Sequence, residues 1–110
     1  MKGTYLGEFE EIVLLTIVAL KEDAYGIGIK DEIEQRSKRK ISIGSLHSTI
    51  TRLEEKGYVN SKLGGATPER GGRSKRFYTI TKNGTAALYR AKDLRDELWQ
   101  LSINSLGRGK

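Results

Sequence analysis

The chain has 110 residues, a formal net charge of +6, one histidine and no cysteine. This length supports one domain with a modest core, and without cysteine there are no disulfides or thiolate metal sites, so we expect no metal or other cofactor. The apolar runs are too short to cross a bilayer and the start lacks a signal-peptide pattern, so we expect a cytoplasmic protein without membrane contact.

The charge is unevenly distributed along the chain. Residues 1–35 contain three basic and eight acidic residues, a net charge of −5, whereas residues 36–82 contain twelve basic and three acidic residues, a net charge of +9. The basic middle segment is the part that we expect to meet phosphate groups. A basic run alone is equally consistent with an ordinary solvated surface.

Two helices are predicted before the basic segment. Residues 7–20 carry apolar side chains on more than one side, which predicts a helix covered by its own core and by a second subunit. A second helix begins near Ala24 and ends in a cluster of cations, which suits both the helix C-terminal dipole and a DNA backbone. The predicted DNA contacts in this cluster are Lys38, Arg39 and Lys40.

A third helix is predicted from its cap Ser42 to Lys56, with Gly57 as the stop. Its core face carries Leu46, Ile50 and Leu53. The other side carries small and polar side chains, which let a helix approach a DNA groove closely, although an ordinary solvated helix shows the same pattern. The predicted DNA contacts on this helix are Ser45, His47, Ser48, Thr49 and Arg52.

Two of these contacts have alternative roles. Arg52 could pair with a guanine, hold a phosphate or pair with an acidic side chain on the helix surface. His47 can donate one hydrogen bond to DNA, but a lone histidine beside a core face more often has a structural role.

A β-hairpin is predicted after the third helix, from strands at residues 58–63 and 75–80. The loop between them, residues 64–74, contains four glycines and the only proline, so it cannot pack a core of its own. We interpret it as a wing that touches DNA, with a plain hairpin linker as the alternative. The predicted DNA contacts here are Arg70, Arg73, Lys75 and Arg76.

A fourth helix is predicted from the cap Thr81 to residue 106. Its apolar residues step by four and three, which is typical of a helix that packs on another helix of the same kind. The predicted dimerisation residues are Ala87, Ala91, Leu94, Leu98 and Leu101. The sequence therefore predicts a mainly α fold with a small β-hairpin: a winged helix-turn-helix at residues 1–81 and a dimerisation helix at residues 82–106 packed on the same domain.

This order of segments resembles the PadR family of transcriptional regulators over about residues 7–101. The matching segments are Glu11-Ile-Val-Leu-Leu, Tyr25-Gly-Ile, Ile43-Gly-Ser-Leu-His, Arg52-Leu-Glu-Glu-Lys-Gly-Tyr-Val, Gly71-Gly-Arg-Ser-Lys-Arg-Phe-Tyr and Thr79-Ile-Thr-Lys-Asn-Gly. The resemblance implies a homodimer, usually a repressor, whose final helix dimerises against the partner's first helix. The single C-terminal helix resembles the short-tailed branch of the family, and His47 stands where the family commonly has tyrosine.

We therefore expect a sequence-specific repressor that binds double-stranded DNA as a homodimer on an inverted-repeat operator and is released by an unknown signal. Some members of the family hold planar effectors against a tryptophan of the last helix, which implies a small-molecule pocket near Trp99, with packing in the dimer interface as the alternative. The alternative is a module that binds nucleic acid with little sequence preference, or that binds a protein partner. An enzyme is disfavoured, because the glycine loop lacks the P-loop spacing and no nucleophile and base are paired.

Overall fold

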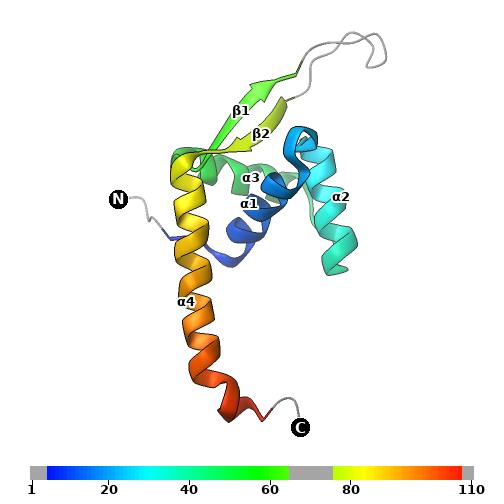
Figure 1. Ribbon diagram of the computed structural model, residues 1–110. Helices are drawn as coiled ribbons and strands as arrows, with labels where there is room; N and C mark the ends of the chain where they lie inside the picture. Colours follow the sequence, from blue (N-terminus) through cyan, green and yellow to red (C-terminus); the bar gives the residue numbers. More distant parts are fainter. Residues whose placement is uncertain (1–4, 65–75, 108–110) are drawn as a thin grey trace.

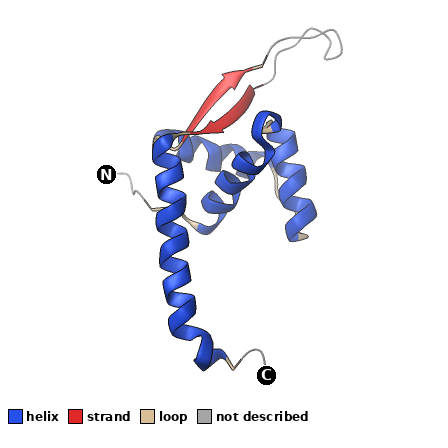
Figure 2. Ribbon diagram, viewed as in Figure 1, coloured by secondary structure: helices blue, strands red, loops and turns tan. Residues whose placement is uncertain are grey.

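The computed structural model describes residues 5–64 and 76–107 of the chain. Within them lie α1 (Glu8–Leu20), the 3-10 turn η1 (Lys21–Asp23), α2 (Gly26–Ser37), α3 (Ile43–Glu55), β1 (Val59–Leu63), β2 (Arg76–Ile80) and α4 (Lys82–Leu106). The first three helices pack together, the hairpin projects from one edge, and α4 runs past them and away (Figure 1). The predicted fold, mainly helical with one small hairpin, is confirmed (Figure 2).

The core forms where α1 meets α2 and α3. Each helix contributes apolar residues three or four positions apart, a spacing that places them on one face of a helix. The fully or nearly fully buried members are Val13, Leu14, Ile17, Ile29, Ile33, Leu46, Ile50 and Leu53. The second apolar side of α1, at Leu15 and Val18, remains about half exposed.

The hairpin is held to the start of α2. Strands β1 and β2 pair antiparallel, with Val59 opposite Ile80 and Leu63 opposite Arg76. The amide nitrogen of Tyr78 donates to the carbonyl oxygen of Ala24 at 3.0 Å, and the rings of Tyr25 and Phe77 lie 5.8 Å apart. These contacts fix where the hairpin leaves the helical core.

The first turns of α4 are fastened to the end of α3. Gly57, at φ +79°, lets the chain turn sharply after α3, as a glycine stop should. The Thr81 hydroxyl donates to the Gly57 carbonyl oxygen at 2.6 Å and accepts from the Gly84 amide at 3.0 Å, so the predicted cap is confirmed. Gly84 itself lies against the backbone of Tyr58: a Cβ there would be 2.4 Å from the Tyr58 carbonyl oxygen.

Candidate nucleic-acid interface

Helix α3 turns one face to the core and the opposite face to solvent. Its first turn is stabilised by the Ser42 hydroxyl, which accepts from the Ser45 amide at 3.0 Å, as predicted for the cap. We call the solvent side the reading face. Its exposed residues are Ile43, Gly44, Ser45, His47, Ser48, Thr51, Arg52, Glu54 and Glu55.

Thr49 does not belong to the reading face. Its side chain is 1% exposed, because Thr49 follows Leu46 by three residues and precedes Leu53 by four, a spacing that places all three on the core face. Its hydroxyl oxygen accepts a hydrogen bond from Arg52 Nη2 at 3.2 Å. The prediction that Thr49 contacts DNA is therefore wrong.

Arg52 is engaged by a carboxylate from another helix. The Glu10 side chain, 8% exposed, accepts from Arg52 Nε at 3.4 Å and from Lys56 Nζ at 2.8 Å and 3.0 Å. It also accepts from the Gly7 amide at 2.8 Å. Of the roles left open for Arg52, pairing with an acid is the one present here, although the acid comes from α1 and not from the surface of its own helix.

The Glu10 cluster predicts a pH-dependent contribution to stability. Burial alone would raise the pKa of Glu10, but hydrogen bonds from Lys56, the Gly7 amide and Arg52 lower the pKa below its ordinary value of 4.5. Because the folded state has the lower pKa, the stabilisation is complete above about pH 4.5 and is lost as the pH falls through the folded-state value. Glu10→Gln is expected to lower the free energy of unfolding by about 1–3 kcal/mol at pH 7.

Urea denaturation of parent and variant between pH 7 and pH 3 measures this effect. The difference between the two proteins should shrink as the pH falls. Glu8→Gln is the matched control, since the exposed Glu8 lies in the same turn and only approaches Arg39 at 3.9 Å. A Glu10→Gln difference that stays constant down to pH 3 would contradict the charged role of this carboxylate.

The predicted cations at the end of α2 lie on the surface. Lys38, Arg39 and Lys40 are all exposed, and Lys38 ends the helix in the left-handed conformation at φ +61°. The Arg39 guanidinium lies 5.7 Å from the centre of the Phe9 ring, within the range of a cation–π contact. These positive charges follow α2 directly and precede the reading face in the chain.

One further predicted DNA contact, Arg76, lies on the hairpin. Arg76 is exposed, and its Nη1 donates to the Ser61 hydroxyl across the strand pair at 2.8 Å. The other predicted wing contacts, Arg70, Arg73 and Lys75, lie outside the described residues.

The predicted dimerisation residues of α4 divide into an inner and an outer group. Ala87 is 3% exposed and packs in the chain's own core, so its prediction as a contact with a second subunit is wrong, and Ala91 also packs against that core. We call the remaining three residues the outer seam. They are Leu94, Leu98 and Leu101, which are 57%, 52% and 74% exposed.

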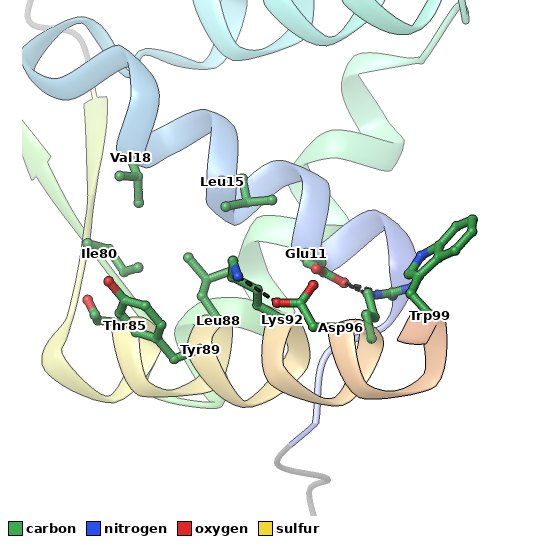
Figure 3. A pocket seen from close by; sticks show the side chains of 11 residues that line it. Glu11, Leu15, Val18, Ile80, Thr85, Leu88, Tyr89, Lys92, Asp96 and Trp99 are labelled. Atoms are coloured by element: carbon green, nitrogen blue, oxygen red, sulfur yellow. Dashed lines mark hydrogen bonds and ion pairs between the residues drawn. The ribbon is translucent and has the colours of Figure 1, made fainter. Parts of the chain in front are cut away.

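A largely apolar hollow of about 650 Å³ lies between α1 and α4 (Figure 3). Leu15 and Val18 point from α1 toward α4, and Trp99 stands at one end of the hollow. The ion pairs Arg95–Glu11 and Lys92–Asp96, at 2.7 Å and 2.6 Å, border it. We call this space the α1–α4 hollow.

No signal in the sequence had pointed to a functional role for Glu10, Lys56 or Ile43. Glu10 could have been found as the capping residue three positions after the N-cap Gly7, the signal confirmed by its bond to the Gly7 amide. In the described segments, no three His, Asp or Glu side chains are grouped to hold a metal ion. No helix in the same segments is long and apolar enough to cross a membrane.

Three packed helices, an exposed polar face on the third and a hairpin beside it define a winged helix-turn-helix protein. A model of the transcriptional regulator PadR-like family matches residues 14–90, and the chain belongs to that family. It is therefore a transcriptional regulator that binds DNA and not an enzyme, as predicted. A comparison with curated proteins gave no significant match.

Solved structures of similar proteins share the fold. A PadR family transcription regulator from Clostridium difficile R20291 is 19% identical, with 89% of this chain and 98% of that chain covered and a TM-score of 0.70. A PadR-like transcriptional regulator from Bacillus cereus ATCC 14579 is 17% identical, with 93% of each chain covered and a TM-score of 0.69. A PadR-like transcription factor from Bacteroides fragilis is 20% identical, with 89% and 88% covered and a TM-score of 0.70.

Proposed function

We propose that the chain is a sequence-specific repressor that binds an inverted-repeat operator as a homodimer and leaves it when a signal arrives. The observation that carries the proposal is the pairing of two exposed surfaces on one small domain. The reading face on α3 is mostly polar, whereas the outer seam on α4 is apolar. The first suits a DNA groove, and the second suits another copy of the chain.

Each surface has a distinct role in this proposal. Side chains of the reading face contact base edges, while the cations at the end of α2 and on the hairpin hold phosphates. The outer seam, together with the exposed side of α1, packs against the same elements of a second subunit. Residues 1–81 thus bind DNA and residues 82–106 join the subunits, so two α3 helices would enter the major groove about 34 Å apart.

Selection of bound sequences from random DNA, followed by footprinting, tests this function. The full-length protein should enrich an inverted repeat whose half-sites are about one helical turn apart. The selected operator, placed over a promoter in a purified transcription reaction, should then give less transcript when the protein is added. A protein that binds the selected and random DNA equally would instead be the alternative, a module that binds nucleic acid with little sequence preference.

The signal is proposed to be a planar apolar ligand that binds in the α1–α4 hollow against Trp99, between the two subunits. Apolar walls and an aromatic side chain 55% exposed at one end support this assignment. Trp99 is the only tryptophan, so its fluorescence reports on this site alone. A panel of planar aromatic compounds should include one that quenches the fluorescence and weakens operator binding; unchanged fluorescence throughout would remove the hollow as the effector site.

A further inference from the structure

Ile43 is a large apolar side chain exposed at the start of the reading face. It is the first residue of α3 and is 44% exposed. It is not one of the buried residues that form the core. Nearly half of the Ile43 side chain is therefore open to solvent in the single chain.

The surroundings of Ile43 are open to an approaching duplex. Apart from its chain neighbours and the backbone of its own helix, no atom lies within 4 Å of where a Cβ on the next residue, Gly44, would be. His47, one turn later on the same side of the helix, is also exposed. The N-terminal residues of a recognition helix are those that contact base edges, so Ile43 stands where sequence is read.

The chemistry of the side chain restricts what it can recognise. Isoleucine has no hydrogen-bond donor or acceptor, so it cannot distinguish the polar edges of the bases. In the major groove the C5 methyl group of thymine is the one apolar group that a base presents. We propose that Ile43 reads the methyl group of one thymine in each half-site of the operator, an inference that rests on the proposed sequence-specific binding.

Replacing thymine by deoxyuridine removes only the methyl group and keeps the base pair. Each thymine of the selected operator would be replaced in turn, in both half-sites together, and the affinity measured for the full-length parent and for Ile43→Ala. One replacement should weaken binding by the parent about fourfold per half-site, the equivalent of one lost methyl contact. For Ile43→Ala the same replacement should have no effect.

Ile27→Ala is the matched control, because Ile27 is a similarly exposed isoleucine that lies on α2 and not on the reading face. It should keep the full response to deoxyuridine, and thermal melts should show both variants folded. The role of Ile43 is overturned if the parent binds every deoxyuridine operator as tightly as the thymine operator, or if Ile43→Ala keeps the parent's response. A parent without any preferred operator would overturn the proposed function as well.

Discussion

Replacing Leu94 and Leu98 with Asp is expected to convert the protein to monomers and to abolish operator binding. Both side chains belong to the outer seam, and more than half of each is exposed on the single chain. In the proposed dimer each would be buried against the second subunit, where an unpaired carboxylate costs several kcal/mol. Light scattering at micromolar concentration measures the oligomeric state, and gel shifts with the selected operator measure binding.

A control variant with the same added charge distinguishes disruption of the outer seam from a general effect of negative charge on DNA binding. Gln100→Asp with Asn104→Asp adds two acids to α4 at exposed polar positions that are not part of the outer seam. This variant should remain a dimer and keep most of its operator affinity. A parent that is itself monomeric at micromolar concentration would show that the outer seam does not join subunits.

Gly84→Ala is expected to lower the free energy of unfolding by about 3 kcal/mol, the upper range for overpacking. Inside a helix, replacing glycine by alanine normally raises the free energy of unfolding by about 1 kcal/mol. Whether such a substitution stabilises or destabilises the protein therefore depends on what surrounds the new Cβ. Here the added Cβ would lie 2.4 Å from the Tyr58 carbonyl oxygen and 2.8 Å from Ile80 Cγ1. Backbone at Tyr58 cannot retreat without disturbing the junction of α3, the hairpin and α4.

Gly44→Ala provides the opposite expectation within the same protein. Gly44 also lies in a helix, but a Cβ there meets nothing within 4 Å, so this variant should be as stable as the parent or up to about 1 kcal/mol more stable. Thermal melts of the three proteins at one concentration measure the difference, because the stability of the proposed dimer would depend on concentration. An equal rise in melting temperature for Gly84→Ala and Gly44→Ala would contradict the close approach at Gly84.

Local signals in the sequence were sufficient to predict the ends of the helices. Ser42 and Thr81 cap the helices that follow them, and Gly57 ends α3 with a positive φ. Such features depend on the side chain and backbone of a few neighbouring residues, so they can be recognised without knowing the fold. The apolar residues on two sides of α1 likewise predicted a helix covered by its own core and by a second subunit. The cover by its own core is confirmed, whereas Leu15 and Val18 on the other side are about half exposed in the single chain.

Contacts between distant segments could not be predicted in the same way. Glu10 and Lys56 are 46 positions apart, and their pairing depends on how α1 crosses α3. The sequence therefore left the partner of Arg52 open. Ala87 has the same four-and-three spacing as the other predicted dimerisation residues. Which of these residues face the chain's own core depends on how α4 lies on the domain, and the spacing does not show this. Thr49 is different: its spacing from Leu46 and Leu53 already indicated the core face.

The first turns of helix α4 pack on the rest of the domain, whereas its C-terminal part is exposed. The helix contains neither glycine nor proline between Gly84 and Gly107. It is therefore expected to be a straight and rigid helix. With 25 residues it is about 37 Å long, so a tilt of a few degrees moves its far end by about 2–3 Å. In the proposed dimer, the crossing angle of two such helices would set the spacing of the two reading faces, so the proposed signal would break register with the DNA without unfolding any segment.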